Sequence, residues 1–202
     1  MKNIARTGYY AALTAATASA GFTAVQILQV AGVTHYPLDA VLIYASSLCI
    51  APPFVLTVLS LHYVITPVKK FWSHSALVFS VIYLVFAMLV YIVQLGAVIP
   101  YKLTSEVLVV TPHSLFWTID AIAYINMGIA AFFMAQLFGK HGLQMWLRNV
   151  LLLHALTTPL VVLVYFYPVF SIPLLLLASP WSITSVASLI LLSLYFKKVV
   201  SS

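Results

Sequence analysis

The sequence predicts an all-α integral membrane protein, a bundle of six transmembrane helices with both termini on the cytoplasmic side. Its 202 residues are 64% hydrophobic and only 6% charged, whereas soluble domains carry about 25% charged residues. The apolar residues gather in six runs, and about 20 such residues are enough for a helix to cross a bilayer. We therefore expect residues 1–202 to form a single transmembrane domain that is embedded in the lipid bilayer.

The first predicted span covers residues 8–32 and follows the basic residues Lys2 and Arg6. The segment 18–20, Ala-Ser-Ala, resembles a signal-peptidase site, but the apolar run continues past it to full spanning length. Small residues recur at a spacing of four along this run. Such a stripe lets a second helix approach closely, and it is the face through which we expect a homo-oligomer to form. Its members are Gly8, Ala12, Ala16, Ala20 and Ala24.

The second and third predicted spans cover residues 40–66 and 71–99. Pro52 and Pro53 lie near the middle of the second span, where paired prolines predict a kink or a break. The third span carries Gln94 near its far end. The connection that follows, residues 100–112, is the longest of the chain, and its apolar middle either lies along the interface or pairs as a short strand.

The last three predicted spans cover residues 113–138, 146–166 and 172–196. Pro159 lies in the middle of the fifth span and Pro180 about a third of the way into the sixth. If the two halves of the chain have opposite orientations, the second and fifth spans correspond, and both contain mid-helix proline. Interrupted helices at matching positions of inverted halves are typical of transporter binding sites.

The basic residues predict the orientation of the bundle. Of the nine Lys and Arg residues, eight lie on the same side of the membrane as the N-terminus. Lys102 alone lies in the connections on the opposite side. Cytoplasmic loops are enriched in Lys and Arg, so we expect a multi-pass protein of the cell membrane with both termini in the cytoplasm. Those eight residues are Lys2, Arg6, Lys69, Lys70, Lys140, Arg148, Lys197 and Lys198.

Asp120 is the one carboxylate inside an apolar run and the predicted centre of the protein. A charged side chain at the bilayer centre costs about 3 kcal/mol on insertion scales, so it normally faces a bundle interior or a water-filled cavity. We expect Asp120 to face the interior and to find a hydrogen-bond partner on another helix, through Gln94 or Ser182. At helical spacing its face is shared by His113, Trp117, Tyr124 and Met127.

Each of the six runs places a hydrogen-bonding side chain in its outer third. One hypothesis is a polar chamber that opens to the outside, with Asp120 at its base. The other is that these groups only hold the helices together by hydrogen bonds. For the first hypothesis, the predicted ligand-binding residues are Asp120, Tyr124, Trp117, Gln26, Gln94 and Ser182.

No cofactor or metal is predicted, although three histidines are candidates for one. His62, His74 and His154 lie near the cytoplasmic side, where imidazoles at similar depth suit haem or a transition metal, but no local ligand spacing supports this. No binding or catalytic role is expected for the remaining polar or reactive side chains. We expect Cys49 to pack as a small hydrophobe, and we expect solvated loop positions for His35, Asp39, Glu106 and His113.

The sequence is compatible with three functional classes of membrane protein. The polar layer and the interrupted helices favour a transporter-like bundle that binds an ion, a small molecule or a lipid. A membrane-embedded enzyme or redox protein acting on a lipid or quinone is the alternative, and an accessory structural subunit is a third. Nucleic acid is not expected as a partner, because the basic residues lie singly or in pairs at the ends of apolar runs. The chain contains no nucleotide-binding loop and no CxxC motif.

Overall fold

The computed structural model describes residues 2–201, and every regular element within them is helical. A 3₁₀ turn begins the third of the crossing segments, a π-helical segment ends it, and a short break divides the sixth. The elements are α1 Lys2–Val30, α2 Leu38–Val64, η1 Pro67–Lys69, α3 Lys70–Val93, η2 Gln94–Val98, α4 Leu115–Ala135, α5 Gly142–Phe166, α6 Ile172–Leu177 and α7 Pro180–Ser201.

Six helical segments within residues 2–201 are long and apolar enough to cross a membrane. Their order and approximate positions agree with the six predicted spans, although the first begins at Lys2 and the last reaches Ser201. The prediction of an all-helical chain with six candidate spans is therefore confirmed. Such a pattern of apolar helices indicates a multi-pass membrane protein.

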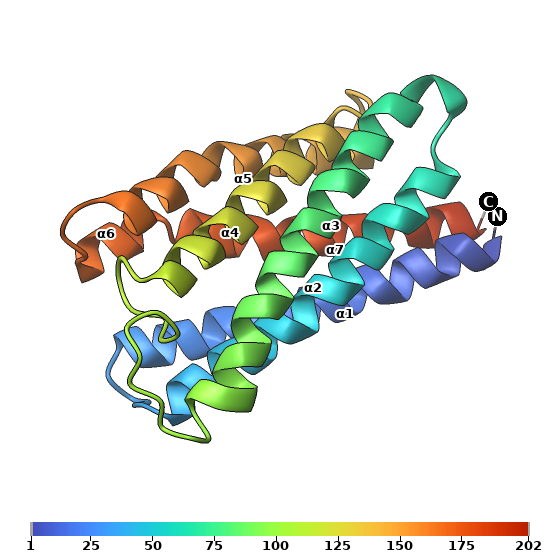
Figure 1. Cartoon of the computed structure of the whole chain (residues 1–202). Coiled ribbons are helices and arrows are strands. Elements are labelled where there is room, and N and C mark those ends of the chain that lie inside the picture. The colour runs from blue at the N-terminus through green and yellow to red at the C-terminus, as the bar shows by residue number, and fades with distance from the viewer. Residues whose placement is uncertain (1, 202) are drawn as a thin grey trace.

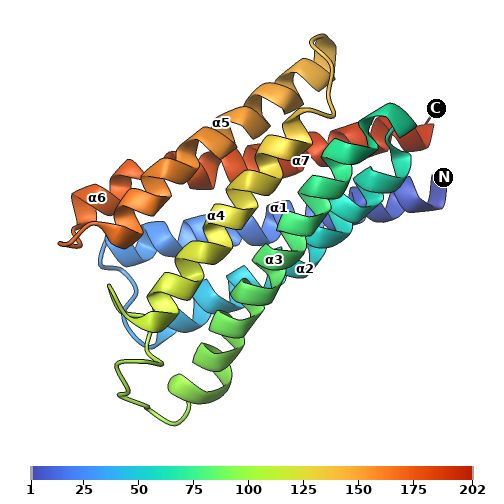
Figure 2. The ribbon, with the colours of Figure 1, turned by 45° about the horizontal axis from the view of Figure 1, so that its top comes forward.

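The helices form a closed ring (Figure 1). Each crossing segment packs on its neighbour in the sequence, α1 on α2, α2 on α3, α3 on α4, α4 on α5 and α5 on α7. The ring closes because α7 also packs along α1. Both ends of the chain lie at the same end of the bundle, as Figures 1 and 2 show from two directions. We call the opposite end, where α6 lies, the distal end.

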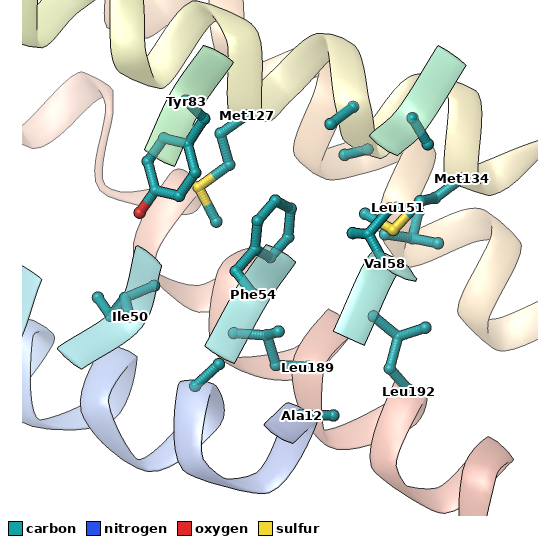
Figure 3. Packing of buried hydrophobic residues seen from close by; sticks show 14 of the residues in the cluster. Ala12, Ile50, Phe54, Val58, Tyr83, Met127, Met134, Leu151, Leu189 and Leu192 are labelled. Atoms are coloured by element: carbon teal, nitrogen blue, oxygen red, sulfur yellow. The ribbon is translucent and has the colours of Figure 1, made fainter. Parts of the chain in front are cut away.

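A layer of apolar side chains fills the middle of the ring (Figure 3). Phe54 of α2, Tyr83 of α3, Met127 of α4 and Leu189 of α7 meet there and are almost fully buried. Many large apolar side chains point instead away from the bundle and are exposed. An apolar exterior of this kind suits contact with lipid, since lipid chains are as apolar as leucine.

The small residues of α1 are used inside the chain. Gly8 lies directly beneath the ring of Phe196 on α7, where an added Cβ would meet the ring. Ala12 and Ala16 are also buried, whereas Ala20 is exposed. The buried part of the stripe therefore joins α1 to its neighbours in the ring, and it is not available to a second copy of the chain.

The prolines interrupt the fold at a different place from the one predicted. α2 continues through Pro52 and Pro53, and α5 continues through Pro159, so of the kink or break predicted in α2 the break does not occur. Neighbouring helices on both sides can support a proline-containing membrane helix. The break occurs instead before Pro180, which begins α7, because proline suits the first turn of a helix and disfavours helix at the residue before it.

Two local predictions at the distal end are corrected, and one of two alternatives is excluded for a third segment. α4 begins at Leu115 with the Ser114 hydroxyl accepting from the Trp117 amide, so His113, with a φ of 69°, lies before the helix and not on its face. Asp39 belongs to the first turn of α2 and is 7% exposed, so it is not a solvated loop residue. The connection 100–112 forms turns and contains no strand among its described residues.

Candidate functional site

A large cavity opens at the distal end of the bundle. Its volume is about 770 Å³, and all six crossing segments contribute to its wall. We call it the distal chamber. Most of its lining is apolar, and eleven of its polar and aromatic members come from six helices, α1 to α5 and α7. They are Phe22, Gln26, Gln29, Tyr44, Tyr91, Trp117, Asp120, Tyr124, Tyr165, Trp181 and Ser182.

Asp120 lies at the wall of this chamber and is only 6% exposed. The hydroxyl of Tyr91 on α3 donates to Asp120 Oδ1 at 2.7 Å, and the hydroxyl of Tyr165 on α5 donates to Oδ2 at 2.5 Å. The Tyr124 hydroxyl lies 3.0 Å from that of Tyr91. Both carboxylate oxygens thus accept hydrogen bonds from phenols on two other helices. The two distances are short, as is typical of hydrogen bonds to a charged acceptor.

Aromatic contacts fix the rings around Asp120. Trp117 lies against Tyr165 with ring centroids 4.5 Å apart, and its indole Nε1 donates to the Tyr165 carbonyl at 2.9 Å. Trp181 of α7 meets Tyr124 edge-on at 4.8 Å, and Tyr44 of α2 stacks on Tyr91 at 5.7 Å. The carboxylate therefore lies within a set of rings that hold one another in place.

Five of the six predicted binding residues line the chamber. Asp120, Tyr124, Trp117, Gln26 and Ser182 come together there from α1, α4 and α7. The sixth, Gln94, is buried at the π-helical end of the third segment and donates to the Leu108 carbonyl at 2.6 Å. Gln94 therefore secures the connection that follows.

The expectation that Asp120 is buried and bonded to another helix is confirmed, but its partners differ from those predicted. The donors are Tyr91 and Tyr165, not Gln94 or Ser182. The predicted partners were an amide and a serine hydroxyl, and Tyr91 and Tyr165 were not among them. Tyr91 precedes Gln94 by three residues and so shares its helix face, and Tyr165 lies near the distal end of α5 as Asp120 does in α4. A search for every donor at that depth would have found both.

A second buried carboxylate lies at the rim of the chamber. Asp39 accepts from Gln29 Nε2 at 2.7 Å and from the amide of Ala40 at 2.7 Å. Gln29 lines the chamber, so this pair links the end of α1 to the start of α2 beside the opening. Asp39 differs from Asp120 in its donors, which are a backbone amide of the first turn of its own helix and the neutral side-chain amide of Gln29.

None of the three histidines considered for a metal lines the chamber. His62 and His74 meet edge-on with ring centroids 5.7 Å apart, and His62 Nδ1 lies 3.0 Å from the Ser73 hydroxyl. His154 Nδ1 lies 2.9 Å from the hydroxyl of Thr184. Within residues 2–201, no three His, Cys, Asp or Glu side chains gather closely enough to hold a metal ion.

Comparison of the chain with known protein families, characterised proteins and solved structures gave no match. The class therefore rests on the fold alone, an all-helical protein with six candidate membrane-spanning helices in a ring. Its distinguishing feature is a chamber at the distal end with one buried carboxylate in its wall.

Proposed function

We propose that this protein binds a small molecule in the distal chamber and works as a transporter-like bundle of the cell membrane. The observation that carries the proposal is the chamber of about 770 Å³ around Asp120. Ligand pockets span roughly 300–1,000 Å³ and combine apolar walls with a few polar groups. A bundle held together by hydrogen bonds alone has no need for a cavity of this size.

The placement of basic residues supports a distal chamber that opens to the outside. Lys69, Lys140 and Arg148 lie in or beside the connections at the terminal end of the bundle, whereas Lys102 lies at the distal end. The positive-inside tendency then assigns the terminal end to the cytoplasm. In that orientation the ligand reaches Asp120 from the outer side of the membrane.

The break between α6 and α7 supports a role in transport. Ala178 and Ser179 form the break and also line the chamber. Discontinuous helices at a binding site are a common feature of transporters.

A ligand screen by thermal stability tests the proposal. A ligand that binds the native state at 100 times its Kd stabilises it by about 2.7 kcal/mol. The purified protein is screened against metabolites, ions and lipids, and each compound that raises the unfolding temperature is retested on Ala40→Trp, whose new side chain fills part of the chamber. We expect stabilisation of the parent and a weaker effect on this variant.

The matched control is Ala24→Trp, because Ala24 is exposed on α1 and does not line the chamber. This control should respond to ligand as the parent does. The proposal fails if no compound stabilises the parent, as expected of an accessory subunit. It also fails if Ala40→Trp responds as strongly as Ala24→Trp.

A further inference from the structure

We propose that the distal chamber takes a monovalent organic cation that carries an apolar group. The inference rests on the proposed function and names the class of ligand for the same chamber. It follows from three features of the wall, namely an uncompensated carboxylate, a set of aromatic rings around it, and an apolar mouth.

The first feature is the charge of Asp120. Two phenol hydroxyls lie 2.7 Å and 2.5 Å from its two oxygens, and such short distances are typical of hydrogen bonds to an ionised carboxylate. None of the described residues that line the chamber is Lys, Arg or His. A buried charge is costly unless it is paired, and phenols supply hydrogen bonds but no positive charge. A cationic ligand supplies the missing charge.

The second feature favours an organic cation over a metal ion. Calcium takes six to eight oxygen ligands and magnesium six, whereas this wall offers a single carboxylate whose oxygens already accept hydrogen bonds. Aromatic rings attract alkylammonium groups through their negative faces, as in the cages that bind methylated amines. Tyr44, Trp117, Tyr124 and Trp181 place such rings in the wall that holds Asp120.

The third feature is the apolar remainder of the chamber and its mouth. Val161, Val164 and Leu175 line the wall. Two exposed lining residues, Ile27 of α1 and Ile183 of α7, lie at the surface of the bundle. These two side chains make the mouth of the chamber apolar, so the mouth accommodates hydrocarbon. A ligand with a charged head at Asp120 and an apolar group toward the mouth satisfies both parts.

Three probes with the same alkyl chain test the inference by calorimetric titration of the protein in lipid nanodiscs, with empty nanodiscs as the blank. They are hexyltrimethylammonium, 1-hexanol and hexanesulfonate. We expect the cation to bind at least about tenfold more tightly than either of the others, as a desolvated cation–π and charge contact would give. Equal binding of cation and alcohol, or preference for the sulfonate, overturns the inference and leaves the proposed function intact.

Two carboxylate-removing variants locate the effect. Asp120→Asn keeps the shape of the side chain and should lose the preference for the cation. Glu106→Gln removes one negative charge from an exposed position that does not line the chamber, and it should retain the preference. If Asp120→Asn does not fold, the selectivity of the parent among the three probes still decides the matter. Binding of no probe by the parent overturns the inference, and the broad screen then decides the proposed function separately.

Discussion

At the scale of single residues, the protein depends on how Asp120 is held. Placing a carboxylate among apolar helices is unfavourable, and membrane lipid offers it no partner. Here two phenols from α3 and α5 supply one hydrogen bond to each oxygen. These bonds join three helices at one point and leave the carboxylate at the chamber wall.

Removing one of these donors should destabilise the fold measurably. Tyr165→Phe keeps the ring that packs on Trp117 and deletes the hydroxyl that donates to Asp120 Oδ2. We expect a loss of about 1–2 kcal/mol, because hydrogen bonds to charged groups are worth about 1.5–3 kcal/mol in soluble proteins and those between membrane helices somewhat less. Reversible unfolding in mixed micelles measures the difference.

The control for this prediction is Tyr195→Phe. Tyr195 lies on α7 against Phe138 and Phe196, away from Asp120, so removing its hydroxyl should change stability little. Equal losses for the two variants would mean that the Tyr165 hydroxyl has no special role at Asp120.

At this scale the sequence predicted that Asp120 is buried and bonded to another helix, but not which side chains donate to it. A single carboxylate in an apolar run is easy to recognise in a sequence. Its burial in the membrane is unfavourable without a hydrogen-bond partner, so a partner can be expected. Tyrosine is ambiguous because it has an apolar ring and a polar hydroxyl, and twelve tyrosines in this chain offer many candidates. Which of them meet Asp120 depends on the order of helices around the ring, and no local pattern records that order.

At the scale of elements, two close contacts set how the helices pack. Phe196 of α7 covers Gly8 of α1, and Thr158 of α5 covers Gly128 of α4. Small residues at such contacts let backbones approach closely, which is a main source of stability between membrane helices. The first contact closes the ring, and the second lies along the pair that carries Asp120 and Tyr165.

Gly128→Ala should therefore destabilise the α4–α5 pair. A Cβ built on Gly128 overlaps the Thr158 hydroxyl and approaches its Cβ and Cγ2 atoms. Overpacking of this kind typically lowers the free energy of unfolding by about 1–3 kcal/mol. We therefore expect the variant to unfold at a lower temperature than the parent. Thermal unfolding in detergent reports the change.

Gly96→Ala is the comparison, because a Cβ at Gly96 meets nothing within 4 Å. It should unfold at nearly the parent temperature. A Gly128→Ala variant as stable as Gly96→Ala would show that α4 and α5 do not pack as closely as described.

The helices were predictable from hydrophobicity, whereas their interruptions were not. Long apolar runs give spans with approximate ends, and the six segments agree with them. Proline alone did not identify the break, because α2 and α5 continue through theirs and the sixth segment stops before Pro180. Packing on neighbouring helices decides whether a proline is tolerated, and that information is not local.

At the scale of the whole molecule, the ring places both termini at one end and the chamber at the other. Neighbours in sequence are neighbours in space, as expected for connections that are mostly short. The contact of α7 with α1 is the one that sequence order does not suggest, and it brings Trp181 and Ser182 into the chamber beside Gln26.

Labelling of single cysteines tests the orientation in the membrane. In a Cys49→Ser background, we expect Tyr36→Cys and Thr104→Cys to react in intact cells with a reagent that does not cross membranes, because both residues are exposed in distal connections. His141→Cys, in an exposed connection at the terminal end, should react only after the cells are opened. Protection of residue 36 or residue 104 in intact cells would contradict cytoplasmic termini.

The most direct test of the central account is whether the wall around Asp120 is an open chamber. Ser182 and Ser188 both lie on α7 and are 7% and 5% exposed, but only Ser182 lines the chamber. In the Cys49→Ser background, Ser182→Cys should be modified by a small water-soluble methanethiosulfonate, faster by its cationic than by its anionic form, while Ser188→Cys should stay unmodified. Equal protection of both cysteines, or equal reaction of both, would contradict a chamber at the distal end.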